Sequence, residues 1–150
     1  MKPKLVARCN ASVEPHLQPG EHILLHSIAQ IGKVPLKKQI GVAAAAAIAS
    51  GGVHAVAVKP HVSLLVITNK RVFLLANQIG PHRNIEAILT REGLTIDPVE
   101  RHLVTISTMV HPADADAPIR FRWAARQKTE GQRVIAELAN TIDRANHEHP

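Results

Sequence analysis

The sequence predicts a mainly β (α+β) domain: a bent sheet or half-open barrel of about seven antiparallel strands, capped by a C-terminal helix. Three observations lead to this class. Short apolar runs alternate with turn residues along the chain, an amphipathic helix pattern comes at the end, and 150 residues suffice for one domain with a sizeable core. An alanine-rich segment after the first strand is expected to add an inserted helix.

The composition fits a globular protein with an aliphatic core. Hydrophobic residues make up 45% of the chain but aromatic residues only 2%, which disfavours the aromatic platforms that stack single-stranded nucleic acid. With Cys9 as the single cysteine, no intrachain disulfide can form, as is usual in reducing compartments. The net charge of +6 favours anionic partners.

The chain divides into an N-terminal segment, 1–16, a single domain, 17–146, and a disordered tail, 147–150. Prolines interrupt residues 1–20, so we expect only a short helical turn there, over Val13–Leu17. The turn at Pro19–Gly20 then leads into a first strand over Glu21–Ile31.

The alanine-rich helix is expected over Leu36–Ser50, within an insertion spanning residues 33–58. Five successive alanines favour a helix, and Gly51–Gly52 would end it. Val53–Val58 alternates and predicts a short strand.

A hairpin is the clearest β signal. Ser63–Ile67 and Val72–Ala76 are apolar at consecutive positions, which predicts strands buried on both faces or lying under a helix. Residues 68–71 join them, and Asn69 suits the left-handed backbone of a tight turn.

The remaining strands are separated by turns at Gly80–Pro81, Glu92–Gly93 and Asp97–Pro98 and by a loop over His111–Pro118. The predicted strands are Ile85–Arg91, Leu94–Ile96, His102–Met109 and Ile119–Trp123. In the last of these, Ile119, Phe121 and Trp123 should face inward, and Arg120 and Arg122 outward.

The terminal helix is predicted from a capping-box pattern and an apolar stripe. Thr129 is followed three positions later by Gln132, as in a helix N-terminus. The expected buried face carries Val134, Ile135, Leu138, Ile142 and Ala145.

Two short motifs resemble the bacterial PH-like and GRAM-like families. They are Leu17-Gln-Pro-Gly-Glu21, before the first strand, and Thr68-Asn-Lys-Arg71, in the hairpin. The resemblance covers roughly residues 17–144 and implies a PH-like fold that binds lipid, peptide or itself and has no catalytic machinery. The chain departs from the family pattern in the insertion at Lys33–Val58.

The first candidate anion site combines the hairpin tip with the basic start of the insertion. Its residues are Lys33, Lys37, Lys38, Lys70 and Arg71. Arginine offers a two-pronged donor to carboxylate or phosphate, and lysine a point charge. The alternative is that Arg71 packs along the barrel and pairs with a carboxylate.

The second candidate anion site is a basic stripe. Arg120 and Arg122 share one strand face, and Arg126 and Lys128 follow. Such a stripe could meet anionic lipid. The alternative is a solvated face of the sheet.

The apolar run Ile40–Val58 has three explanations: a membrane span, shallow membrane association, or a packed small-residue helix, which its glycines, Ser50 and His54 favour. No metal site is expected, because His22 and His26 lie on a strand too far apart for joint ligation. The sequence shows neither a nucleophile elbow nor a phosphate-binding loop, so we expect no cofactor and no enzyme.

These observations predict a non-enzymatic binding module that docks on an anionic surface, either a protein partner or lipid head groups, with self-association through the alanine-rich helix. The alternatives are a basic nucleic-acid-binding protein, which lacks the usual motifs, and a structural subunit of an oligomer. A cytoplasmic location is expected, with peripheral attachment at the inner face of the membrane as a variant.

Overall fold

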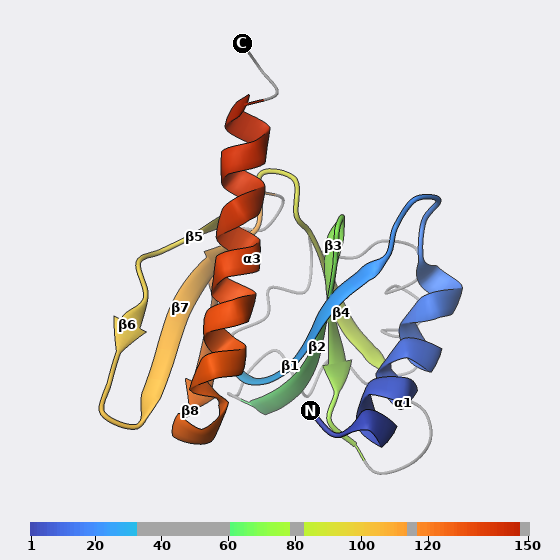
Figure 1. The fold of residues 1–150 in the computed structure, drawn as a ribbon, viewed down its shortest axis with the longest axis horizontal. Helices are drawn as coiled ribbons and strands as arrows, with labels where there is room; N and C mark the ends of the chain where they lie inside the picture. Colours follow the sequence, from blue (N-terminus) through green and yellow to red (C-terminus); the bar gives the residue numbers. More distant parts are fainter. Residues whose placement is uncertain (33–60, 79–82, 114–116, 148–150) are drawn as a thin grey trace.

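The computed structural model describes residues 1–32, 61–78, 83–113 and 117–147, with side chains as far as residue 140 (Figure 1). The helical elements are α1 (Pro3–Val13), η1 (Glu14–His16), η2 (Ala125–Gln127) and α3 (Lys128–His147). The strands are β1 (Ile23–Ile31), β2 (His61–Thr68), β3 (Arg71–Ala76), β4 (Ile85–Thr90), β5 (Thr95–Ile96), β6 (Glu100–Arg101), β7 (Thr105–His111) and β8 (Ile119–Ala124).

The described strands form one antiparallel sheet in the order β4-β3-β2-β1-β8-β7-β5, with β6 also paired to β7. Strand β1 joins the two halves: it pairs with β2 from Ile23 to Ile31, but with β8 only at Gln30 and Ile31. The sheet therefore curls at β1 into a half-barrel, and α3 lies over its concave face (Figure 1). This confirms the predicted fold class.

The main core lies between the concave face of the sheet and α3. Trp123 and Phe121 of β8 pack there against Val134 and Leu138 of α3, all fully buried. The indole Nε1 of Trp123 donates to Ser27 Oγ of β1 at 2.9 Å, which satisfies its polar atom. The inward and outward alternation predicted for β8 is confirmed.

Gly131 explains how closely α3 approaches β8. A Cβ atom at this position would lie 2.6 Å from the Trp123 ring, which is closer than two non-bonded carbon atoms can approach. The first turn of α3 therefore sits on the indole only because residue 131 has no side chain. The helix begins at Lys128, so Thr129 lies inside the first turn and is not the N-cap residue that the sequence pattern predicted.

The convex face of β2–β4 is covered by α1. Cys9 and Val13 of α1 are fully buried against Phe73 and other apolar side chains of these strands. The consecutive apolar residues of β2 and β3 are buried on both faces for this reason, as predicted. The short helical turn expected over Val13–Leu17 is present as η1, but the longer helix α1 before it was not expected. Pro3 stands in the first turn of α1, where its missing N–H breaks no helical bond.

One turn and the start of one strand differ from prediction. Asn69 does not take a left-handed backbone, because no non-glycine residue in the described ranges has a positive φ. Its side chain instead links β1 to the hairpin: Oδ1 accepts from His22 N at 2.9 Å and Nδ2 donates to Gly20 O at 3.1 Å. The predicted strand His102–Met109 begins only at Thr105.

Several predicted elements cannot be compared with the structure. The helix over Leu36–Ser50 and the strand over Val53–Val58 lie outside the described residues, as does the turn at Gly80–Pro81. The same holds for three residues of the first candidate anion site, Lys33, Lys37 and Lys38.

Candidate functional site

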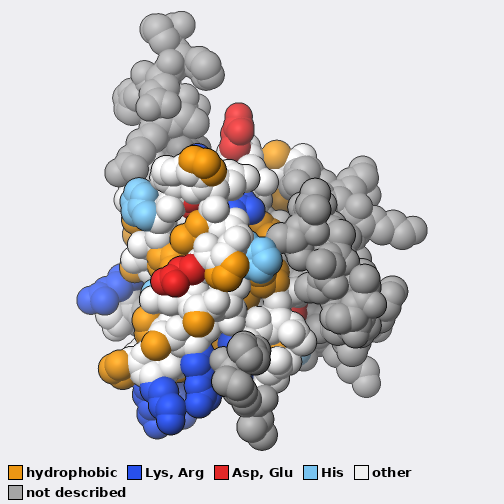
Figure 2. Space-filling view, turned by 90° about the vertical axis from the view of Figure 1, so that its right-hand side faces the viewer, with side chains coloured by type: hydrophobic (Ala, Val, Ile, Leu, Met, Phe, Trp, Pro, Cys, Tyr) orange, Lys and Arg blue, Asp and Glu red, His pale blue; other side chains and the backbone are white. Residues whose placement is uncertain are grey.

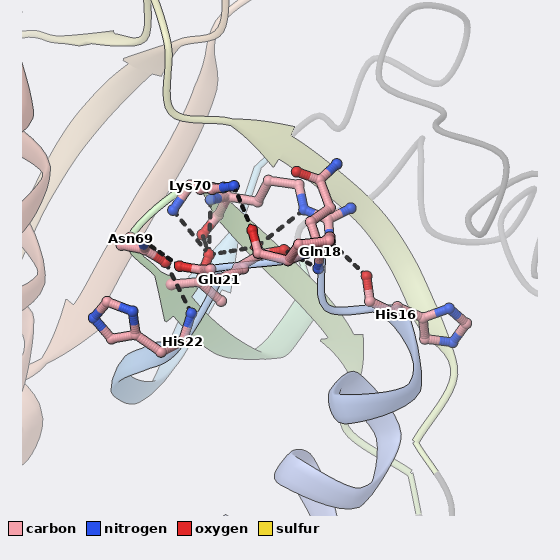
Figure 3. Close-up of polar contacts among 10 residues, drawn as sticks. His16, Gln18, Glu21, His22, Asn69 and Lys70 are labelled. Atoms are coloured by element: carbon pink, nitrogen blue, oxygen red, sulfur yellow. Dashed lines mark hydrogen bonds and ion pairs between the residues drawn. The ribbon is translucent and has the colours of Figure 1, made fainter.

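The hairpin of β2 and β3 holds a buried ion pair between Arg71 and Glu21 (Figure 3). Arg71 Nη2 donates to Glu21 Oε2 at 2.6 Å and Nε donates to Oε1 at 3.0 Å. A further bond runs from Arg71 Nη2 to the carbonyl of His16 at 2.6 Å. This two-pronged geometry is the strongest pairing that arginine makes with a carboxylate.

The Glu21 carboxylate is held in its charged form. Burial works against the charge, but hydrogen bonds from Arg71, from Thr68 Oγ1 and from Gln18 N outweigh it, and they lower the pKa of Glu21 below its ordinary value. The two resemblance motifs therefore meet in space, because Glu21 ends one and Arg71 ends the other. The contact ties the start of β1 to the hairpin.

Arg71 thus takes the role that the alternative prediction gave it. Its guanidinium also lies 4.8 Å from the centre of the Phe73 ring, which fixes the side chain along the sheet. The neighbouring Lys70 is exposed, and its Nζ donates to Pro19 O at 2.8 Å. Anion binding at this hairpin stays a prediction.

The second candidate site is brought together on the convex face. Arg120 and Arg122 both point outward from β8, next to Gln30 and Gly32 of β1. Gly32 N donates to Arg120 O at 2.8 Å, and a Cβ on Gly32 would stand 3.1 Å from Arg120 Cβ. The glycine therefore lets the two strands approach closely beside the arginines.

Two hollows open on this face, one on each side of Arg122. We call them together the β8 groove. The first, of about 410 Å³, is lined by Gln30, Gly32, Met109, Ala117, Pro118, Arg120 and Arg122. The second, of about 510 Å³, is lined by Ile28, Ala29, Gln30, Val62, Asn77, Thr105, Arg122, Ala124, Arg126 and Gln127. Neither lining contains an acidic residue of the described chain.

Arg122 stands in the middle of the β8 groove with part of its charge unsatisfied. Its Nε is buried and has no hydrogen-bond partner among the described residues. A buried donor without a partner costs free energy, so an acceptor that reaches it would be bound favourably. Arg120, by contrast, is exposed.

Sequence reasoning missed a third feature, the turn between β6 and β7. His102 N donates to Thr105 O at 2.9 Å, so Leu103 and Val104 occupy the centre of a tight turn. They are 95% and 60% exposed. A turn could not be predicted here, because neither position has the glycine, proline or asparagine that usually marks one.

Cations gather around that turn. Arg101 is exposed beside it, and Lys128 Nζ donates to the carbonyl of Leu103 at 3.3 Å. Arg126 is exposed in the short helix just before Lys128. Figure 1 shows the β6–β7 turn and the start of α3 at the same lower end of the molecule as the start of α1.

The start of α1 adds two exposed lysines to this end, Lys2 and Lys4. Figure 2 views the α1 side and shows Lys and Arg side chains gathered at its lower end, while the acidic ones lie higher. We call the lower end of the molecule in Figure 1, from the β6–β7 turn to the start of α1, the basic end; its residues are Lys2, Lys4, Arg101, Leu103, Val104, Arg126 and Lys128.

One polar cluster has the residue types of a hydrolase triad but not its geometry. His61 Nε2 lies 2.9 Å from Ser63 Oγ and 3.0 Å from Glu86 Oε2. A catalytic histidine contacts serine and carboxylate through different ring nitrogens, whereas both contacts here use the same one. Ser63 is also fully buried, so this hydroxyl is out of reach of a substrate.

Other reactive groups in the described ranges are equally enclosed. Cys9 is fully buried, and burial raises the pKa of its thiol, which keeps it protonated. The described residues contain no cluster of three or more histidine, cysteine or acidic side chains placed to hold a metal ion. They also include no helix of the length and apolar character needed to cross a membrane.

Comparison with solved structures shows a likeness in fold. A crystal structure of a pleckstrin homology domain from Shewanella amazonensis SB2B is similar, with a TM-score of 0.45 and 13% sequence identity, covering 88% of this chain and 96% of that one. No family model matches the sequence, and no curated protein matches it.

The strand order, the curl at β1 and the helix over the concave face define a PH-like half-barrel. The resemblance therefore implied the correct, PH-like fold, but it does not establish membership of a family. Its GRAM-like part stays a prediction.

Proposed function

We propose that this protein is a non-enzymatic binding module that docks peripherally on an anionic lipid surface through its basic end. The observation that carries the proposal is the exposed Leu103–Val104 turn with cations around it. A PH-like fold suits such a role, although the fold alone leaves the ligand open.

The turn has no structural reason to be apolar. The central positions of a tight turn are normally filled by residues that ease the backbone, such as glycine, asparagine or proline. Leu103 and Val104 do not ease the backbone of the turn, and they expose apolar surface to water. Each side chain would gain up to about 2 kcal/mol if it were fully buried in an apolar layer.

The cations complement an anionic surface. Each lysine or arginine near such a surface contributes roughly 1 kcal/mol, and the gain falls off within a Debye length. Five of the seven residues of the basic end are cationic. Two acidic residues lie beside the basic end: Glu100, which is exposed and 3.7 Å from His102, and Glu130, which pairs with the N-terminal amine at 3.4 Å.

Vesicle flotation tests this proposal with phosphatidylcholine vesicles, made with and without phosphatidylglycerol. We expect the protein to float only with the anionic vesicles, and less as salt is added. Replacing both Leu103 and Val104 by serine should reduce the bound fraction several-fold. The matched control is Val62→Ser, which removes an apolar side chain of β2 that is 44% exposed.

A second control addresses the competing hairpin site. Lys70→Gln should leave vesicle binding unchanged, because Lys70 lies on the β2–β3 turn. Loss of binding in Lys70→Gln, or unchanged binding in the Leu103 and Val104 double variant, would refute docking through the basic end. The nucleic-acid and oligomer alternatives stay predictions, and the alanine-rich helix invoked for self-association lies outside the described residues.

A further inference from the structure

We infer that the β8 groove is a second binding site, which takes an extended acidic segment of a protein partner. This site shares Arg126 with the basic end, but it is centred on Arg122 and does not depend on membrane docking. Its ligand would carry Asp or Glu at alternate positions and contact Arg120, Arg122 and Arg126 in turn.

The shape of the β8 groove favours an elongated ligand over a single small anion. Its two hollows, of about 410 and 510 Å³, share Gln30 and Arg122 as a common border. A lone phosphate would meet Arg122 and leave most of this volume unused. A peptide that crosses the border can fill both hollows.

The spacing of the arginines matches that of an extended chain. Arg120 and Arg122 are two positions apart on one strand, so their Cα atoms lie about 6.7 Å apart. Alternate side chains of an extended peptide repeat at the same interval. Arg126 lines the second hollow, beyond Ala124, and provides a third cation along the groove.

Recognition by side chains is expected where the backbone of β8 is already paired. Strand β7 pairs with β8 along its whole length, and β1 pairs with it at Arg122 and Phe121. A peptide therefore cannot add to β8 as a further strand at these two positions. The guanidinium of Arg122, whose side chain is only half-buried, would contact the carboxylate.

The linings also suit the stems of acidic side chains. Met109, Ala117 and Pro118 give the first hollow an apolar wall, while Gln30 can donate from its amide. An aliphatic stem ending in a carboxylate, as in glutamate, matches such a mixture of apolar wall and arginine. A flat membrane surface would reach the exposed Arg120 but would not fill the two hollows.

The test is an NMR titration of the isotope-labelled full chain with two capped peptides of equal composition. One is Glu-Thr-Glu-Thr-Glu and the other is Glu-Glu-Glu-Thr-Thr. We expect the alternating peptide to bind more tightly and to shift the signals of Gln30, Arg120 and Arg122. Equal binding of the two peptides, or shifts confined to other surfaces, would overturn the proposal.

Substitutions assign the contact to one side chain. Arg122→Gln should weaken binding of the alternating peptide about tenfold, since a charge-assisted pair is lost, and Arg122→Lys should restore only part of it. The matched control is Arg133→Gln, which removes an exposed arginine from α3. If this control weakens binding as much as Arg122→Gln, the effect is general electrostatics and the site is wrong.

Competition separates this ligand from other anions. Inorganic phosphate at equal charge should displace the alternating peptide poorly, and displacement by phosphate would refute a peptide site. Anionic vesicles share only Arg126 with the peptide, so complete displacement by vesicles would refute it as well. Vesicle flotation of Arg122→Gln should stay normal, so failure of one proposal leaves the other intact.

Discussion

Arg71 and Arg122 are both strand arginines that the sequence marks as candidate anion contacts, but the structure treats them in opposite ways. Arg71 meets Glu21, which lies fifty positions earlier, and both prongs of its guanidinium are used. Arg122 lies in an open groove with a buried Nε that has no described partner. A nearby carboxylate, and not the arginine itself, therefore decides whether a strand arginine forms a structural ion pair or stays available to bind a ligand.

The two halves of the sheet also differ in what covers their convex faces. The convex face of β2–β4 lies under α1 and is apolar at consecutive positions. The convex face of β8 carries arginines and opens into two hollows. One half of the half-barrel is therefore closed on both faces, and the other half presents side chains outward.

Replacing each arginine with methionine tests this difference through the free energy of unfolding, and the larger effect is expected at Arg71. Arg71→Met leaves the Glu21 carboxylate buried without its partner, so we expect the free energy of unfolding to fall by about 3 kcal/mol or more. Urea unfolding measures this loss. A loss below about 1 kcal/mol would mean that the ion pair is not an internal tie.

The double variant Arg71→Met with Glu21→Leu serves as the control for that result. Removing both charges together should restore most of the lost stability, because well-packed apolar residues can replace a buried ion pair at little cost. If the double variant is as unstable as Arg71→Met, packing around Phe73 and not the unpaired carboxylate explains the loss.

Lowering the pH should also weaken the ion pair between Arg71 and Glu21, with a smaller loss in the free energy of unfolding. The pKa of Glu21 is lowered from its ordinary value of 4.5, so its contribution to stability is present above that value. The contribution is lost as the pH falls through the lowered pKa of the folded state. The free energy of unfolding should therefore drop more steeply below pH 4.5 in the wild type than in the double variant.

His26 adds a separate dependence of stability on pH, which cancels when the wild type is compared with the double variant. Burial lowers the pKa of His26 from its ordinary value of 6.5, so some stability is lost below pH 6.5 as the unfolded chain takes up a proton. This loss is common to the wild type and the double variant. A difference between them that appears already at pH 6 would contradict the assignment to Glu21.

The smallest expected effect is at Arg122. Arg122→Met should change the free energy of unfolding by less than about 1 kcal/mol in either direction, because no described carboxylate is left unpaired. Urea unfolding alongside Arg71→Met makes the comparison direct. A large loss for Arg122→Met would place this arginine among the internal ties and weaken the case for the β8 groove.

The fold could be predicted because its signals are local. Apolar runs mark β2, β3 and β4, alternation marks the two faces of β8, and an apolar stripe marks α3. Helix α1 escaped prediction because prolines and polar residues hide its stripe of Leu5, Cys9 and Val13. Its burial depends on Phe73 and the other strand residues it covers, which lie far away in the sequence.

The candidate sites were only partly predictable. Arg120 and Arg122 could be found from alternation, since neighbouring positions of a strand point to opposite faces. The Leu103–Val104 turn could not, because its residues are those of a strand and only the contact between His102 and Thr105 shows the reversal.

The sequence by itself therefore determined the half-barrel class, the terminal helix and the outward face of β8, because periodicity and propensity act between near neighbours. Tertiary structure decided which cations remain available. That choice depends on contacts between residues far apart in the chain, such as Glu21 with Arg71 and Lys128 with the Leu103 carbonyl. Local patterns carry no information about such partners, so the half-barrel could be expected from the sequence while its binding surfaces had to be observed.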